Sequence, residues 1–136
     1  MRKITILSLI LLSIATLTRC KKESIDIRDG FIGPYSVTET WTENSKTITK
    51  PAFSMSAGKS SQNASVVLLN NFANYGAGTT AEATVKGNSL TIPEQTLSNS
   101  KTITGSGSLS GATMIFTYTE SYNSVSISIT ATALKR

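Results

Sequence analysis

The side chains with the widest chemical scope in this sequence are two glutamates on the apolar side of their strands. Glu39 and Glu120 follow the same alternation as the aromatic residues beside them. Two carboxylates facing one cavity could act as an acid and base pair or as the polar end of a ligand site. Cross-strand pairing gives a plainer interpretation, in which Glu39 meets Lys50 and Glu120 meets Lys101 near the strand ends. We favour these salt bridges over catalysis.

The composition removes several further chemistries. The sequence contains no His and a single Cys. Histidine acid–base catalysis, Ser-His-Asp triads, histidine-containing zinc sites and a disulfide inside the monomer are therefore impossible within the chain. There is no metal-binding cluster and no nucleophile with an identifiable base. We expect a protein that is not an enzyme and has no metal and no cofactor.

The single thiol, Cys20, needs a separate explanation. It follows a short basic start, Met1-Arg2-Lys3, and a mostly apolar run over residues 4–17, which is shorter than the roughly 20 residues that span a bilayer. This start resembles the lipoprotein signal of Gram-negative bacteria, with Leu17 at the third position before the Cys. It departs from that pattern at Arg19, where the family prefers a small residue. The resemblance implies a signal peptide over residues 1–19 and a lipid on Cys20.

The interpretation of residues 1–20 as a lipoprotein signal also predicts where the protein is located and what it binds. Lipid on Cys20 would hold the protein to a membrane, and we expect the cell envelope, at the outer membrane. Without Arg2, Lys3 and Arg19, ten basic residues remain against eight acidic ones, so the net charge falls from +5 to +2. No stripe of Lys and Arg is left, and we expect no nucleic-acid partner. A protein partner in the envelope stays open.

The rest of the chain predicts an all-β domain. Residues 20–34 are interpreted as the lipidated Cys and a tether, and residues 35–136 as the domain. Thr, Val and Ile are abundant there, faces alternate, and turn residues recur. We expect strands near 35–42, 46–55, 64–71, 79–86, 89–93, 101–109, 112–121 and 124–134.

Four expected two-residue turns give a strand register that can be tested. Turns at Asn44-Ser45 and Gly87-Asn88 pair Trp41 with Ile48 and Val85 with Leu90. The turn at Ser110-Gly111 predicts the pairs Leu109–Ala112, Gly107–Met114, Gly105–Phe116 and Ile103–Tyr118. The turn at Tyr122-Asn123 predicts the pairs Tyr118–Ile127, Phe116–Ile129 and Met114–Ala131. In this register one face is apolar and the other mostly carries hydroxyl groups.

Two segments resemble small lipocalin-like lipoproteins of Gram-negative bacteria. They are residues 26–35 and 85–93, and Gly33-x-Tyr35 is similar to the Gly-x-Trp that opens lipocalin barrels. Tyr stands here in place of the family's Trp. The resemblance implies an antiparallel up-and-down meander of about eight strands that closes into a small barrel, which removes exposed strand edges. A two-sheet β-sandwich is the alternative.

Two functions follow from such a barrel. In the first, it binds a small apolar ligand without catalysis, in a pocket lined by Trp41, Met114, Phe116 and Tyr118, with Glu39 as its polar group. In the second, these residues fill a solid core, and the protein is a structural or protein-interaction module of the envelope. The Asn- and Gly-rich segment 70–78 could expose its aromatics to a sugar or peptide, but we favour tight turns there.

Overall fold

The structure is a computed structural model that describes residues 24–136. The expected signal peptide and Cys20 lie outside these residues. The described chain forms nine strands and one turn of 3-10 helix, η1. In chain order they are β1 (Gly33–Glu43), β2 (Lys46–Thr49), β3 (Phe53–Lys59), β4 (Val66–Asn70), η1 (Phe72–Asn74), β5 (Thr80–Lys86), β6 (Ser89–Thr96), β7 (Thr102–Ser110), β8 (Thr113–Tyr122) and β9 (Val125–Lys135).

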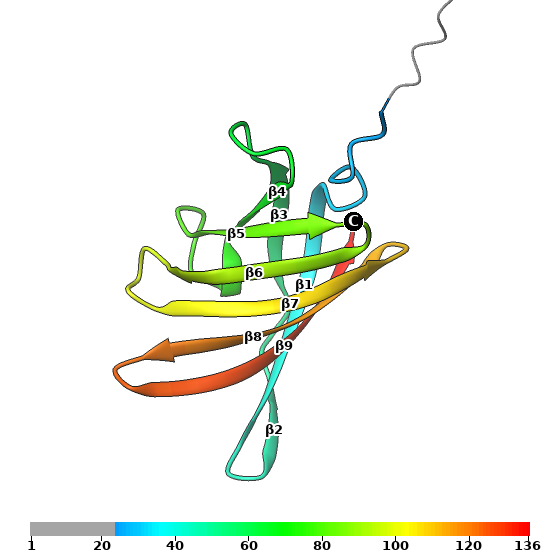
Figure 1. The fold of residues 1–136 in the computed structure, drawn as a ribbon. Helices are drawn as coiled ribbons and strands as arrows, with labels where there is room; N and C mark the ends of the chain where they lie inside the picture. The colour runs from blue at the N-terminus through cyan, green and yellow to red at the C-terminus, as the bar shows by residue number, and fades with distance from the viewer. Residues whose placement is uncertain (1–23) are drawn as a thin grey trace, which may run out of the picture.

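The strands form one closed antiparallel barrel (Figure 1). Neighbours in the sheet follow chain order from β3 to β9, and β9 pairs with β1 to close the ring. β2 and β3 follow one another along the other edge of β1, against residues 40–43 and 33–37 respectively. The ring therefore has eight strands, with β2 as an additional short strand. The expected up-and-down barrel is confirmed, and the alternative two-sheet sandwich is not the architecture.

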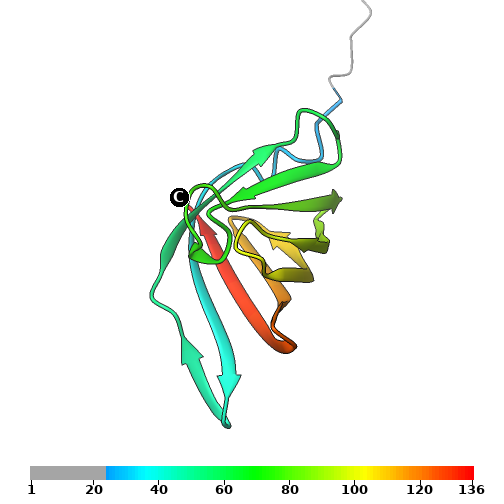
Figure 2. The ribbon, with the colours of Figure 1, turned by 90° about the vertical axis from the view of Figure 1, so that its left-hand side faces the viewer.

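The break between β2 and β3 divides a strand that the sequence predicted as continuous over residues 46–55. Residues 50–52 belong to no strand, and Pro51 lies at their centre. Because proline has no backbone N–H, it cannot donate a ladder hydrogen bond. β1 and β2 extend as a hairpin past the rest of the barrel, at the end opposite the N-terminal segment (Figures 1 and 2).

The inner face holds one hydrophobic core, as the alternation predicted. Along β5, for example, Ala81, Ala83 and Val85 are buried while the residues between them are exposed. The outer faces of β7, β8 and β9 carry mainly Ser and Thr, which pair across strands, as in Thr117 with Thr130. Only the inner side chains are removed from water, so burial of this one face holds the barrel closed.

The expected register holds for two hairpins and is wrong for the other two. Trp41 pairs with Ile48 and Val85 with Leu90, as predicted. In the β7–β8 and β8–β9 hairpins every pair is shifted by two residues. The observed pairs include Leu109–Met114, Gly107–Phe116, Gly105–Tyr118, Ile103–Glu120, Tyr118–Ile129, Phe116–Ala131 and Met114–Ala133.

Turn chemistry explains the shift. Gly111 occupies the first central position of its turn at φ 58°, where the expected placement would have required Ser110. The β8–β9 turn uses Asn123 and Ser124, both at positive φ, and the expected turn would have forced Tyr122 into that region. Because a shift of two preserves the side-chain face, the apolar face is still the one predicted.

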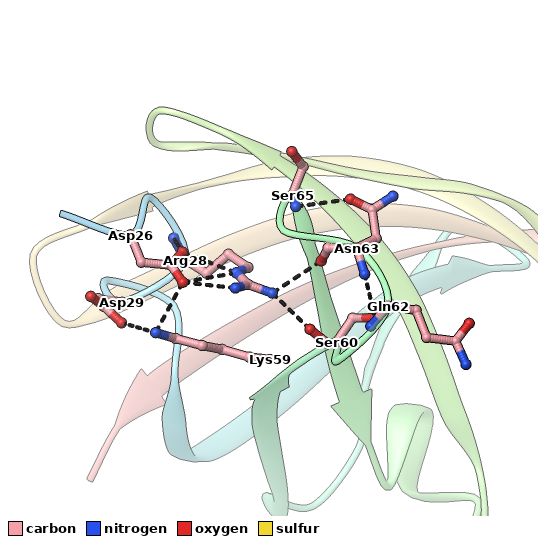
Figure 3. A network of polar contacts seen from close by, with 8 residues as sticks. All are labelled: Asp26, Arg28, Asp29, Lys59, Ser60, Gln62, Asn63 and Ser65. Carbon is pink, nitrogen blue, oxygen red and sulfur yellow. Dashed lines mark hydrogen bonds and ion pairs between the residues drawn. The ribbon is translucent and has the colours of Figure 1, made fainter. Parts of the chain in front are cut away.

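The segment that precedes β1 closes one end of the barrel. Phe31 is buried and its carbonyl accepts a 2.7 Å hydrogen bond from the Tyr35 hydroxyl. Arg28 donates to the carbonyls of Ser60 (2.9 Å) and Asn63 (3.0 Å) in the β3–β4 loop, and its guanidinium pairs with Asp26 at 2.7 Å (Figure 3). We call this the closed end. Part of the segment that we interpreted as a tether is thus folded against the barrel, and β1 begins at Gly33.

Charge pairing reinforces the closed end. The Arg28 hydrogen bonds hold the pKa of the Asp26 carboxyl well below its ordinary value. Lys59 extends the network to Asp26 (3.0 Å) and Asp29 (2.5 Å) (Figure 3). Residues 26–29 are therefore fixed to the β3–β4 region.

Candidate ligand site at the barrel mouth

A pocket of about 200 Å³ opens at the end of the barrel opposite the closed end. We call this end the mouth; it is formed by the β1–β2 turn, residues 71–79, the β6–β7 connection and the β8–β9 turn. The pocket has a charged, an aromatic and an aliphatic part. Its lining residues are Glu39, Trp41, Glu43, Lys50, Tyr75, Tyr118, Glu120, Ile127 and Ile129.

The first charged group of the pocket is centred on Glu39, which lies on the inner face of β1 and is only 2% exposed. Its carboxylate accepts a 2.8 Å hydrogen bond from the Tyr118 hydroxyl. It also forms an ion pair with the Lys50 ammonium, at a distance of 3.2 Å. Burial, and then the negative charge of Glu39, raises the pKa of Tyr118 well above its ordinary value. The Tyr118 hydroxyl therefore remains a donor, and the expected Glu39–Lys50 pair is confirmed.

The second charged group repeats this arrangement around Glu120. The Lys101 ammonium lies 2.6 Å from one carboxylate oxygen, and the Tyr75 hydroxyl donates to the other. Burial, followed by the bond to Glu120, raises the pKa of Tyr75 to about 12. Burial alone would lower the pKa of Lys101, but its hydrogen bonds to Glu120 and Tyr75 outweigh that effect and raise it. The expected Glu120–Lys101 pair is confirmed.

Aromatic rings complete both charged groups. The Lys50 ammonium lies 5.3 Å from the centroid of the Phe53 ring and 5.5 Å from that of Tyr75. The Lys101 ammonium lies 4.4 Å from the Tyr75 centroid. An ammonium over an aromatic face is stabilised by the ring quadrupole. Lys50 and Lys101 are thus each held by a carboxylate and by an aromatic ring together.

Chemically, this arrangement is suited to recognition. Within residues 24–136, every buried side-chain nitrogen or oxygen has a hydrogen-bond partner. The same part of the chain holds no cluster of three or more His, Cys, Asp or Glu placed to bind a metal. It also has no helix long and apolar enough to cross a membrane. The pocket offers fixed charges, phenolic hydroxyls and apolar walls to a ligand.

The residues predicted to bind a ligand lie at two depths. Glu39, Trp41 and Tyr118 line the pocket. Met114 and Phe116 lie in the buried core and do not line it. The expected set is therefore split between the pocket and the core.

Phe72, in η1, occupies the interior beside them. It is 1% exposed, and its ring centroid lies 6.0 Å from that of Phe116 and 4.9 Å from that of Tyr118. The expected tight turns in this segment are confirmed, because Asn71 (φ 58°) and Asn74 (φ 60°) adopt left-handed conformations. They direct Phe72 inward, so its ring is not offered to a sugar or peptide.

Sequence reasoning missed Tyr75, Glu43, Ile127 and Ile129 as pocket residues. The alternation that placed Trp41 inward places Glu43 on the same face of β1, which was a usable signal. Ile127 and Ile129 were assigned to the apolar face, but their position at the mouth depends on the true β8–β9 register. Tyr75 depends on the turns of residues 71–76 and carried no periodic signal.

A second hollow of about 410 Å³ adjoins the pocket on the outer side of β1 and β9. The β1–β9 pairing extends only to Trp41 and Ile129, and the groove begins there. Trp41 and Ile127 are shared by both hollows. The groove is otherwise lined by hydroxyl groups, from Thr40, Thr42, Thr47, Ser126, Ser128 and Thr130.

Comparison with solved structures finds a similar fold. The chain resembles the crystal structure of a "putative outer membrane protein" from Bacteroides fragilis NCTC 9343, with a TM-score of 0.50 and 18% sequence identity. The match covers 82% of this chain and 53% of the other, so this chain spans about half the length of that protein. At this identity the likeness establishes the fold alone. No protein-family model and no curated protein matches the sequence.

Proposed function

We propose that this protein is a lipid-anchored, lipocalin-like lipoprotein of the cell envelope that binds a small ligand at its mouth without catalysis. The observation that carries the binding proposal is the pocket, in which Trp41, Ile127 and Ile129 supply an apolar wall beside buried, fixed polar groups. Apolar walls with a few placed polar groups are typical of small-molecule sites. The outer-membrane name of the similar structure supports the envelope location.

A lipid on Cys20 would orient the mouth. Ser24, the first described residue, follows Cys20 by four residues, and a link of that length spans at most about 14 Å. It leads into the closed end, where Arg28 fixes the chain to the β3–β4 loop. On this proposal the closed end faces the bilayer and the mouth faces away from it.

The lipid anchor is tested by replacing Cys20 with alanine. We expect the full chain, expressed in a Gram-negative host supplied with radioactive palmitate, to incorporate label, and Cys20→Ala to incorporate none. The thiol is the only one in the chain, so no second site can substitute. Replacement of Arg19 with alanine should retain the label. Equal labelling of Cys20→Ala and the unaltered chain would refute the anchor.

The binding site is tested with the emission of Trp41, the single tryptophan of the chain, which lines the pocket. We expect 2-phenylethanol to cause a saturable change in that emission in the full chain, held in lipid nanodiscs. Ile127→Arg places a long charged side chain at a half-buried pocket position and should abolish the change. Ile115→Arg, at an exposed position on the outer face, is the matched control and should retain it.

The filled interior favours one alternative, a structural or protein-interaction module. Phe72 and Phe116 fill the core next to Tyr118, which lines the pocket, and the remaining pocket of about 200 Å³ is small for a drug-sized ligand. If the emission of Trp41 shows no saturable response, or if Ile127→Arg responds like the unaltered chain, the binding proposal is wrong and this alternative is favoured.

A further inference from the structure

We propose that the mouth pocket takes a small organic cation, an amine on a single apolar ring, with its ammonium between Glu43 and Trp41. This inference rests on the proposed function, because it names the ligand class of the same pocket. It is carried by a repeated local arrangement, in which an ammonium is held by a carboxylate and an aromatic ring together.

The arrangement occurs twice with an ammonium from the protein. Lys50 lies 3.2 Å from Glu39 and 5.3 Å from the Phe53 centroid. Lys101 lies 2.6 Å from Glu120 and 4.4 Å from the Tyr75 centroid. Both carboxylates are buried and each is neutralised by its own lysine. Two of the three acidic side chains in the pocket are therefore already matched.

Glu43 and Trp41 offer the same two groups, a carboxylate and an aromatic ring, without an ammonium from the protein. They are two residues apart on β1, so their side chains lie on one face of the strand, and both line the pocket. Among the ion pairs of residues 24–136, none includes Glu43, and no cation lies over the Trp41 ring. Lys46 is the register partner of Glu43 but makes no ion pair with it.

The chemistry of this third pair favours an ammonium. Tryptophan provides the strongest aromatic face for a cation, and contributions run from about 0.5 to 2 kcal/mol with increasing desolvation. The lysines balance Glu39 and Glu120, so Glu43 leaves the pocket with one negative charge. An anionic ligand would be repelled by that charge, and a neutral one would leave it unused.

Pocket size limits the body of the ligand. The volume of about 200 Å³ lies below the roughly 300–1,000 Å³ that is typical of sites for drug-sized ligands. A single ring with a short aminoalkyl chain fits this space, and its ring would contact Ile127 and Ile129. Longer chains would meet Tyr118, which lines the pocket and has the Phe72 ring packed against it at a centroid distance of 4.9 Å.

The test compares 2-phenylethylamine, 2-phenylethanol and phenylacetate, which share a ring and a short chain but differ in charge. Each is titrated into the full chain in nanodiscs of uncharged lipid at low ionic strength and pH 7, with Trp41 emission as the readout. We expect the amine to bind about tenfold more tightly than the alcohol, and phenylacetate to bind most weakly.

Glu43→Gln separates the charge from the shape of the site. Glu43 is exposed, so this substitution should leave the fold intact. It should reduce the affinity for the amine to that for the alcohol and leave the alcohol unchanged. Glu94→Gln, at an exposed position on β6 away from the pocket lining, is the control and should keep the tenfold preference.

The outcomes distinguish this inference from the proposed function. Equal affinity of the unaltered chain for the amine and the alcohol would overturn the cation inference while the binding proposal stands. An amine preference that survives in Glu43→Gln would also overturn it, because the charge would then come from elsewhere. No saturable response to any of the three probes would overturn both.

Discussion

Replacing Phe72 with alanine is expected to lower the free energy of unfolding by about 3–5 kcal/mol, because it removes a fully buried ring from the centre of the core. The ring lies against Phe116 and Tyr118, and these neighbours belong to β8, whose backbone pairs on both sides. They cannot move inward without breaking strand pairing, so a cavity should remain. Urea-induced unfolding of the full chain, followed by the emission of Trp41, measures the loss.

Phe72→Leu is the matched control for this prediction. It retains most of the apolar volume, and changes that nearly conserve hydrophobic volume usually cost less than about 1.5 kcal/mol. If Phe72→Ala lowers the free energy of unfolding no more than Phe72→Leu does, the ring does not fill the interior as described. The same pair of variants tests pocket depth, since Phe72 packs on Tyr118 and Tyr118 lines the pocket. Phe72→Ala alone should bind 4-phenylbutanol more tightly than the unaltered chain.

The strand faces of this fold were predictable from the sequence because period-two alternation is a local property. The Glu39–Lys50 pair followed from one hairpin with an evident turn, Asn44-Ser45, and the structure places the two side chains 3.2 Å apart. For the β7–β8 turn, Gly111 was predicted as a turn residue, but it occupies the first central position and not the second. A two-residue error in register then displaced every partner without changing the face.

The side chains that enter the barrel from residues 71–79 were less predictable than the inner and outer faces of the strands. Phe72 and Tyr75 reach the interior from a segment without periodicity, through left-handed residues at Asn71 and Asn74. A segment with Asn and Gly around its aromatic residues is compatible with an exposed loop and equally with a loop that places those aromatic side chains inside the barrel. Only the closure of β9 onto β1 decides between them, because it brings Tyr118 beside Phe72 and Glu120 beside Tyr75.

Closely approaching strands explain why glycine stands at two inward positions of β7. An added Cβ on Gly107 would collide with the Ile115 carbonyl oxygen and the Phe116 Cβ, and would lie 2.6 Å from the Phe116 Cα. At Gly105 it would lie 2.7 Å from the Tyr118 Cβ. The two glycines thus give Phe116 and Tyr118 the room to stand beside Phe72. They also hold Tyr118 where its hydroxyl reaches Glu39.

Gly107→Ala should therefore destabilise the protein by about 3 kcal/mol, at the upper end of the usual cost of overpacking, because the opposing atoms include backbone that cannot rotate away. Gly58→Ala is the matched control: it lies in β3, and its added Cβ would meet only the Asn70 side-chain nitrogen at 4.0 Å. That variant should be neutral or stabilising by up to about 1 kcal/mol, since alanine restricts the unfolded chain. Thermal unfolding of both full-length variants measures the difference in stability. Equal midpoints would show that β7 and β8 do not approach as described.

The same two variants are also expected to differ in ligand binding. Because the displaced strand carries Tyr118, Gly107→Ala should weaken the response of Trp41 to 2-phenylethanol, whereas Gly58→Ala should leave that response unchanged.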